Sequence, residues 1–597
     1  MKQTFLLISF IFFTNIIFSQ DNNSVLSEGD WYKFSIDTTG VFKIDKRFLQ
    51  KIGISTNNLN PKKIHIYGNG GNLLPVLNSE FRFKDLQENA IYVEGEEDEA
   101  FNNNDYILFY GQGPHSWTTN SITQTALHNQ NIFSDEAFYY ITVNNTDGKR
   151  VQQKTPITNT ASSQITSFDE FVFYEKENIN ILATGNQWFG EDLSFENSVT
   201  VNIPFKKALP NTDISIEVRG ASVSSSTSNM EVAINTQNIF NINFPAVDPD
   251  PSSLTEGFAL KGSRVLENSS DLLGITITFN NNGNPSARGF LDYIEIVGKK
   301  QLLADGNQFS FRSFEQSNAT DIIEFQIANV SNISQVWDVT NHIEPKNITN
   351  ESTINSFNFK AESGVLKEYI VLGQTDFYLP KSLENSKIEN QNLHGLKDIN
   401  YIIITNTELA NQAQRLADYH QNNSNLSTKV INIDEIYNEF SSGSRDITGI
   451  RDFIKHLYET NSSSDKKLKY VTFFGDASYD YKDRISGNNN IVPVKLTFES
   501  FNLATSYVTD DFFVMLDDNE GLMFNSHTVD LASGRIPVST INEAKIAVDK
   551  ILSYYNKEAI GDWRNTITLL ADDIDQTEDI PIQSGVESIA DDIKNNK

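Results

Sequence analysis

Residues 470–480 read Tyr-Val-Thr-Phe-Phe-Gly-Asp-Ala-Ser-Tyr-Asp, a short apolar run that is followed by Gly475 and then by Asp476. A compact apolar run of the same kind occurs upstream at 401–404, and residues 429–433 are predicted as another strand. Segments with helical periodicity separate these strands. Strands that alternate with helices form a parallel sheet whose crossover connections wrap around it. This part of the sequence therefore predicts an α/β domain.

Capping residues mark the helices of this region. Asp446 is placed to cap one helix, and the Thr-Ile-Asn-Glu sequence at 540–543 is a capping box that opens another. Two more strands are expected, one within 529–536 and one at 567–570, and a further helix starts at Ser584. Because the chain ends about one helix after the fifth strand, we expect that the sheet is incomplete and that this sequence is part of a longer protein.

From about residue 31 to residue 390, apolar and polar residues alternate with period 2. The alternation at 32–36, the Thr-Thr-Gly turn at 38–40 and the apolar return at 42–44 predict a β-hairpin. Other alternating runs occur at 199–205, 214–218, 275–279 and 293–297. Short strands separated by Asn, Gly, Ser and Pro clusters predict sandwich or barrel domains.

The chain is therefore expected to have four parts. They are a signal peptide at 1–20, an N-terminal β domain at 21–155, one or more β-sandwich domains at 156–395, and an α/β domain at 396–597 that is incomplete at its C-terminus. The boundary near 155 rests on the polar, strandless connector at 155–163.

The first twenty residues have the pattern of a secretory signal peptide. Lys2 supplies a positive start, residues 5–13 are almost wholly apolar, and Ser19 is a small residue before a polar segment. A membrane anchor is the alternative, but the apolar part is short and Thr14 and Asn15 interrupt it. Since no later window reaches the ~18 apolar residues of a spanning helix, we expect an exported protein with no transmembrane segment.

Composition excludes several kinds of chemistry. None of the 597 residues is Cys, which rules out disulfides, thiolate metal sites, iron–sulfur clusters and a cysteine nucleophile within this sequence. The 47 basic and 78 acidic residues give a formal net charge of −31. Such a surface repels a phosphate backbone, so nucleic acid is not expected as a partner.

Acidic residues follow two of the predicted strands after a single intervening residue. Asp476 follows the strand at 470–474, and Asp572 and Asp573 follow the strand at 567–570. In open α/β sheets the reacting groups gather at the carboxyl ends of the strands, so these three are candidate functional carboxylates. The alternative is that they cap the next helix or turn, as Asp usually does after a strand.

A further acidic group lies close to Gly521 and is a candidate calcium site, because calcium prefers oxygen ligands. The candidate ligands are Asp510, Asp511, Asp517, Asp518 and Glu520. Their spacing does not match an EF-hand loop, and such a run is more often a solvated turn between strands.

Other catalytic motifs do not occur. No pair of the eight His residues has the metalloprotease spacing beside a Glu, and there is no Gly-x-Ser-x-Gly elbow, no Walker loop and no Gly-x-Gly-x-x-Gly after a strand. His420 and His456 lie on predicted helices away from the strand carboxyl ends, and both are expected at the surface.

A series of short motifs runs along nearly the whole mature chain. In the β region they are 31–34 with 39–44, 105–114, and 174–176 with 188–191; in the α/β region they are 474–480, 509–513 and 534–538. In this order, the set resembles the gingipain-type cysteine peptidases of the type IX secretion system. The resemblance implies a caspase-like α/β peptidase domain preceded by β domains.

The resemblance also implies a mechanism that this sequence does not complete. The family uses a His–Cys dyad at the strand ends, in which the Cys attacks a carbonyl and the His serves as acid and base. In the family order both residues fall beyond Lys597, so the chain is not expected to be active alone. Asp572 or Asp573 matches a supporting acidic residue, a glutamate in gingipains, that orients or charge-stabilises the imidazolium.

The family's sortases cleave C-terminal secretion signals from exported cargo at the cell surface, through a thioester acyl-enzyme. The resemblance therefore implies cargo proteins with C-terminal secretion domains and other type IX components as partners, and no required cofactor. It places the protein at the cell surface or outer membrane of a Gram-negative bacterium, or in the periplasm or outside the cell. The alternative is a noncatalytic secreted β-domain protein for binding or adhesion, with a remnant peptidase domain.

Overall fold

The computed structural model describes residues 23–250, 252–268, 270–352, 355–524, 526–577 and 579–595. The predicted signal peptide at 1–20 lies outside these residues. The chain divides into two compact units, with the division between Ser539 and Thr540. Across the described ranges, no helix is both long and apolar enough to cross a membrane.

Two sheets share one core in the N-terminal β region. Their strand orders are β26-β1-β9-β3-β4 and β2-β6-β5. The strands are β1 (Trp31–Ile36), β2 (Gly40–Asp45), β3 (Ile64–Tyr67), β4 (Glu88–Asn89), β5 (Ile91–Glu94), β6 (Tyr106–Gly111), β9 (Ala137–Val143) and β26 (Lys381–Ile388). Helix α1 (Lys46–Lys51) begins after Asp45, whose side chain accepts a hydrogen bond from the amide of Phe48.

The predicted hairpin at 32–44 was wrong, although both of its strands exist. β1 pairs with β9 and β26 while β2 pairs with β6, so the two strands lie in different sheets. Phe34 and Phe42 are both buried in the core that the two sheets share. Period-2 alternation determines which residues face the core, but it does not determine which strand is the neighbour.

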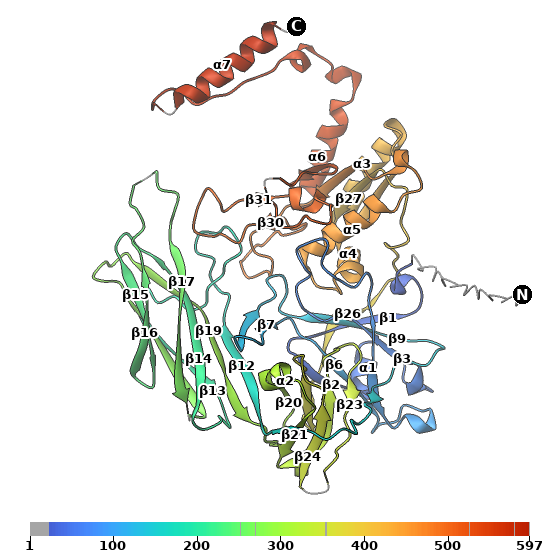
Figure 1. Ribbon diagram of the computed structural model, residues 1–597. Coiled ribbons are helices and arrows are strands. Elements are labelled where there is room, and N and C mark those ends of the chain that lie inside the picture. The colour runs from blue at the N-terminus through green and yellow to red at the C-terminus, as the bar shows by residue number, and fades with distance from the viewer. Residues whose placement is uncertain are drawn as a thin grey trace, which may run out of the picture. The chain divides into compact units, whose positions relative to one another are not determined.

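Two four-stranded sheets form a β-sandwich, drawn in green in Figure 1. Their orders are β12-β19-β14-β17 and β13-β18-β15-β16. The strands are β12 (Ser167–Glu175), β13 (Ser198–Pro204), β14 (Thr212–Val223), β15 (Ser228–Ile234), β16 (Gln237–Phe244), β17 (Phe258–Asn268), β18 (Leu272–Asn280) and β19 (Arg288–Gln301). Alternate residues such as Ile216, Ile277 and Ile294 are fully buried between the sheets. All four alternating runs noted in this region are confirmed as strands.

A third pair of sheets has the orders β10-β23-β22-β25-β20 and β11-β21-β24, with a shared aromatic core around Phe325 and Tyr369. The strands are β10 (Gln152–Gln153), β11 (Ser163–Ile165), β20 (Phe309–Phe311), β21 (Ile323–Ala328), β22 (Ile333–Asp338), β23 (Lys346–Asn347), β24 (Ser356–Ala361) and β25 (Tyr369–Gly373), and helix α2 (Phe314–Asn318) follows β20. A separate hairpin consists of β7 (Ser116–Asn120) and β8 (Thr125–Asn129).

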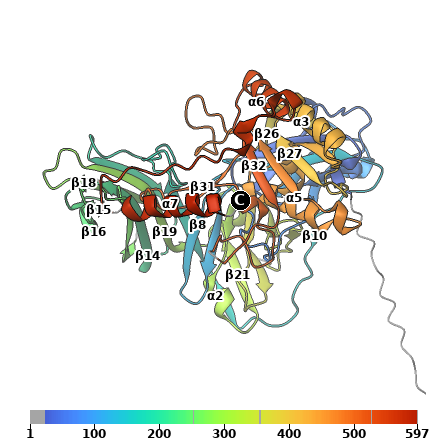
Figure 2. The same cartoon turned by 90° about the horizontal axis from the view of Figure 1, so that it is seen from above.

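The α/β region contains the predicted parallel sheet, with order β28-β27-β29-β32. Its strands are β27 (Tyr401–Thr405), β28 (Thr428–Asn432), β29 (Tyr470–Phe474) and β32 (Ala532–Ile536), and its helices are α3 (Ala410–Asn423), α4 (Ile433–Phe440) and α5 (Ile447–Glu459). Figure 2 shows β27 and β32 running in the same direction. Asp446 caps α5 as predicted, because its side chain accepts from the Thr448 amide at 2.8 Å. A small antiparallel ladder joins β30 (Lys495–Leu496) to β31 (Val508–Thr509).

The second unit contains α6 (Ile541–Tyr554) and α7 (Asp579–Asn595). The predicted capping box of Thr540 and Glu543 is confirmed at the start of α6. The strand predicted at 567–570 was wrong: this segment has no regular structure, and Leu570 is 87% exposed. A strand must hydrogen-bond to a neighbouring strand, and a local apolar pattern cannot supply that neighbour.

Candidate functional site

The carboxyl ends of the parallel strands meet at one edge of the sheet, which we call the rim. β27 ends at Thr405 beside Asn432 of β28, and the Thr405 hydroxyl donates to the carbonyl of Phe474 on β29 at 2.6 Å. A cavity of about 270 Å³, the rim cavity, lies at this edge. It is lined by Asn406, Ile433, Asp434, Tyr437, Arg445, Tyr481, Asp483, Asn488, Asn489, Asn490, Ile491 and Pro493. This is where ligands bind in open α/β sheets.

Asp476 lies at the rim as predicted, but its own loop engages its side chain. One carboxylate oxygen accepts from the Ala477 amide at 2.9 Å. The other accepts from the Asn489 side-chain amide at 2.5 Å and from the Ser539 hydroxyl at 3.2 Å. These bonds tie the loop after β29 to Ser539, the residue that precedes Thr540.

Asp572 and Asp573 lie in the second unit, and both side chains are exposed. The Asp573 amide donates to the Asp572 carboxylate at 3.2 Å. Since the preceding segment at 567–570 is not a strand, the strand-end position that suggested these two carboxylates is not formed.

Arg535, which the sequence reasoning missed, organises the rim. Its guanidinium binds Asp510 through two hydrogen bonds, from Nε at 2.8 Å and from Nη2 at 2.7 Å. It also donates to the carbonyl oxygens of Gly475, Val492 and Pro493. A planar guanidinium can make several such bonds at once. The only local signal for this role was its place in the 534–538 motif.

The candidate calcium ligands do not converge in the structure. Asp510 pairs with Arg535, while the mostly exposed Asp518 pairs with Lys455 at 3.1 Å. Glu520 is 3% exposed, and its carboxylate accepts from the amides of Asp517 and Thr528. The Asp511 side chain is exposed. Within the described ranges, no group of three or more His, Cys, Asp or Glu side chains is arranged to hold a metal ion.

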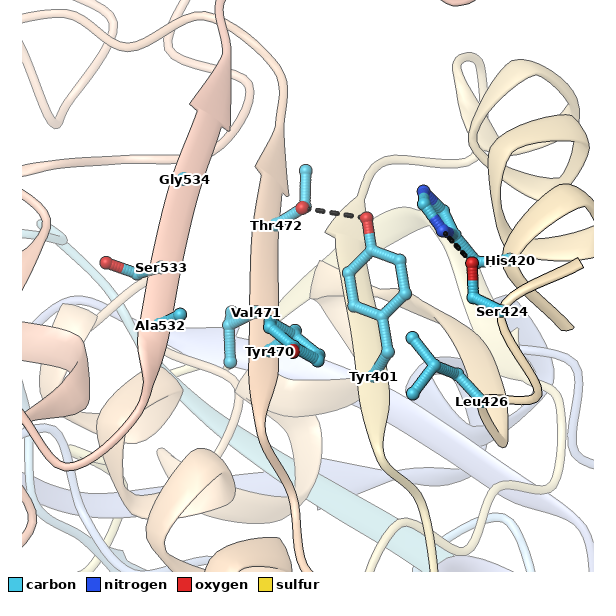
Figure 3. A pocket seen from close by; sticks show the side chains of 10 residues that line it. All are labelled: Tyr401, His420, Ser424, Leu426, Tyr470, Val471, Thr472, Ala532, Ser533 and Gly534. Atoms are coloured by element: carbon cyan, nitrogen blue, oxygen red, sulfur yellow. Dashed lines mark hydrogen bonds between the residues drawn. The ribbon is translucent and has the colours of Figure 1, made fainter. Parts of the chain in front are cut away.

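A second cavity, of about 460 Å³, lies at the opposite ends of the same strands (Figure 3). Tyr401, Tyr470 and Ala532, the first residues of β27, β29 and β32, line it. The Tyr401 hydroxyl is 2.9 Å from the Thr472 hydroxyl. Since this cavity is at the amino ends of the strands, it lies away from the edge where reacting groups gather.

The two histidines that were predicted at the surface are partly buried. His420 lines the cavity at the amino ends of the strands, where its Nδ1 is 3.1 Å from the Ser424 hydroxyl, and burial lowers its pKa. His456 has its Nε2 at 3.0 Å from the carbonyl oxygen of His394. For His420, the prediction that it lies away from the strand carboxyl ends is confirmed, because it lines the cavity at their amino ends.

A joint between the β-sandwich region and the rim brings two of the motif segments together. The Arg484 guanidinium lies 3.6 Å above the Trp188 ring, and Trp188 stacks on Tyr479 with 5.8 Å between centroids. Arg484 and Lys482 both bind Glu177, at 3.2 and 2.6 Å. Glu177 and Trp188 precede β13, whereas the other three residues follow β29, so this joint holds the loop that lines the rim cavity.

Comparison with known proteins identifies the domain that carries the rim. Residues 394–597 match the model of Peptidase family C25. This chain carries a C25 peptidase domain. Family C25 is a family of peptidases. No curated protein matches the chain.

Among solved structures, the dimeric latent PorU from Porphyromonas gingivalis matches with a TM-score of 0.79 and 24% sequence identity. The match covers 92% of this chain and 52% of the PorU chain, so this chain spans about half the length of that protein. It shows a shared fold, and it confirms the predicted order of β domains followed by a gingipain-type α/β domain.

Two carbohydrate-binding modules match only a fifth of the chain. The CBM36-1 domain of a multidomain xylanase from the hindgut metagenome of Trinervitermes trinervoides has 14% identity over 21% of this chain and 96% of its own, with a TM-score of 0.15. CBM36 in complex with calcium and xylotriose has 17% identity over 21% and 98%, with a TM-score of 0.14. TM-scores this low do not establish a common fold.

Proposed function

We propose that this chain supplies the β domains and the first part of the peptidase domain of a type IX secretion system sortase. Such a protein is a cysteine endopeptidase that removes C-terminal secretion signals from exported cargo. The main support is the match to PorU over 92% of the chain, because it extends the likeness from the C25 domain to the β domains. A C25 domain alone would fit a general protease equally well.

The proposed reaction is acyl transfer. A Cys thiolate attacks the carbonyl carbon at the cleavage site, the peptide C–N bond breaks, and the departing amine takes a proton from a His, which leaves a thioester acyl-enzyme. Water or an amine then attacks the thioester and releases the cargo. Since none of the 597 residues is Cys, the proposal requires a Cys and its His from sequence outside these residues. The rim is where this chain would meet the scissile bond.

The remaining parts of the proposal follow from the same role. The partners would be cargo proteins with C-terminal secretion domains and other type IX components, and no cofactor would be required. The protein would act at the cell surface or outer membrane after export by its signal peptide.

Cleavage by the protein expressed from its complete reading frame tests the proposal. A cargo protein with a C-terminal secretion domain should be cut before that domain, and iodoacetamide should abolish cleavage because it alkylates the thiolate. The 597-residue chain, assayed in parallel, should leave the cargo intact. A stop codon directly after Lys597, or a complete protein that binds cargo without cutting it, would instead support the noncatalytic binding protein.

A further inference from the structure

A cavity of about 500 Å³, which we call the Lys33 cleft, lies between the N-terminal sheet and the α/β region. Lys33 of β1, Phe138 of β9 and Leu383 of β26 line one side, and Asn438 of α4 lines the other. Figure 1 shows α4 above β1 and β26. The Lys33 cleft adjoins the rim cavity, because the two share Asp434, Tyr437, Arg445, Tyr481 and Asp483.

Most charged side chains around the Lys33 cleft have a partner of opposite charge. The pairs are Arg445 with Asp483 at 3.0 Å, Lys482 with Asp135 at 2.8 Å, and Lys381 with Glu136 at 3.1 Å. Lys33 and Asp434 differ from these: among the described residues, neither side chain has an ion-pair partner within 4.0 Å. The cleft therefore presents one cation and one carboxylate that are not neutralised by direct contact.

The contacts of the Lys33 ammonium are with neutral groups. Nζ donates to the side-chain carbonyl of Asn438 at 3.0 Å and to the backbone carbonyl of Gly443 at 3.3 Å, and it lies 4.3 Å from the centre of the Phe138 ring. An ammonium has three N–H donors, so these contacts use two of them. Burial lowers the pKa of Lys33 to about 8, Asp434 opposes that shift, and Arg445 adds to it. An acceptor oxygen entering the cleft would stabilise the charge.

We propose that the Lys33 cleft binds the main chain of an extended polypeptide, with Lys33 donating to a peptide carbonyl and Asp434 accepting from a peptide N–H. A peptide group carries one acceptor, one donor and no net charge, which matches an unneutralised cation and carboxylate in the same cleft. A free anion fits less well, because Asp434 would repel it. The inference rests on the proposed function, since it gives the course of the substrate on one side of the rim.

Acylation of lysines on the intact 597-residue chain tests the proposal directly. The reaction is run near pH 8 with and without a pool of capped peptides of about 12 residues whose side chains are uncharged, and mass spectrometry measures the rate at each lysine. We expect the peptides to lower the acylation rate of Lys33 by about tenfold, because a bound peptide carbonyl accepts a charge-assisted hydrogen bond from the Lys33 ammonium. Lys387, which is exposed on β26 and pairs with Asp30, should react at an unchanged rate. An unchanged rate at Lys33 with saturating peptide overturns the proposal.

Peptide affinity, measured by fluorescence anisotropy, provides the matched variant test. Lys33→Met should weaken binding of the capped peptides by about tenfold, while the control Lys387→Met should not. Equal affinities for the two variants overturn the proposal, as does binding that occurs only with peptides carrying a free carboxylate, which would indicate an anion site. If Lys33→Met does not fold, the acylation experiment still decides the matter on the unmodified chain.

Both measurements detect peptide binding, so neither requires the catalytic cysteine that this sequence lacks. Binding without cleavage by the complete protein would contradict the proposed function and leave the Lys33 cleft supported. If the complete protein cleaves cargo but peptides do not slow the acylation of Lys33, the proposed function is supported and the proposal for the Lys33 cleft is contradicted.

Discussion

Replacing His128 by Gln tests how the β7–β8 hairpin is held on the β-sandwich. His128 lies between two carboxylates of the sandwich, with Nε2 at 2.8 Å from Glu175 and Nδ1 at 3.2 Å from Glu295. Its ring stacks on Phe173 with 4.6 Å between centroids. Burial alone would lower the pKa of His128, but the hydrogen bonds and charges of the two carboxylates outweigh it and raise the pKa to about 9.

The expected magnitude follows from the difference between the folded and unfolded pKa values. A rise from 6.5 to about 9 corresponds to about 3 kcal/mol, at ~1.4 kcal/mol per pH unit. Because the folded-state pKa is the higher one, this stabilisation is fully present below pH 6.5 and is lost as pH rises through about 9. The wild-type chain should therefore lose about 3 kcal/mol from this residue by about pH 10, and His128→Gln should not show that loss.

Urea unfolding at pH 6.5 and near pH 10 measures the effect. Trp117 reports on the hairpin, because its ring centroid is 6.0 Å from that of His128, and a Trp117→Phe variant identifies the corresponding fluorescence phase. The matched control is His342→Gln. His342 is partly buried, and burial lowers its pKa, so its removal should leave intact the loss of stability that the wild-type chain shows at high pH. An undiminished pH dependence in His128→Gln would refute the ion-pair reasoning.

Three further substitutions have expected outcomes. Lys33→Met should raise the free energy of unfolding by up to about 3 kcal/mol near pH 7, because burial lowers the pKa of Lys33 from 10.5 to about 8 and each pH unit corresponds to ~1.4 kcal/mol. Urea unfolding should show this difference shrinking as pH rises from about 8 to 10.5, and an unchanged difference would contradict the buried-charge argument. Asp510→Asn should cost about 2–3 kcal/mol in chemical denaturation, because Arg535 loses a charged bidentate partner; no loss would show that the pair contributes nothing. Phe501→Ala should lower the free energy of unfolding by about 3–4 kcal/mol in chemical denaturation, because this side chain is only 4% exposed. The control Phe498→Ala should lower it by less than about 0.5 kcal/mol, because Phe498 is 67% exposed, and equal losses would contradict the packing argument.

Local signals were sufficient for much of the α/β region. Asp446 and the box at 540–543 were readable as helix starts because a cap involves only residues two or three positions apart. The hairpin at 32–44 and the strand at 567–570 failed for the opposite reason. In each case the pattern involves only neighbouring residues, whereas the strand that pairs with it can lie far away in the sequence.

For the candidate site too, local sequence predicts where a residue lies but not which distant residues it contacts. The position of Asp476 at the rim followed from the strand that precedes it, but its engagement by Asn489 and Ser539 depends on contacts 13 and 63 positions away. Lys33 gave no local signal at all, because the Asn438 side chain that it binds is 405 positions distant.

The sequence by itself determined the class of the molecule: a Cys-free, acidic chain in which alternating β strands precede a βα pattern that includes Asp476. Tertiary structure alone decided which strands pair, that Arg535 holds Asp510, and that Lys33 lies unneutralised in a cleft beside the rim. Hydrophobic periodicity and caps act over a few residues, so a sequence records them directly. Sheet neighbours, ion pairs and burial of charge depend on segments hundreds of residues apart, and they exist only once the domains have packed.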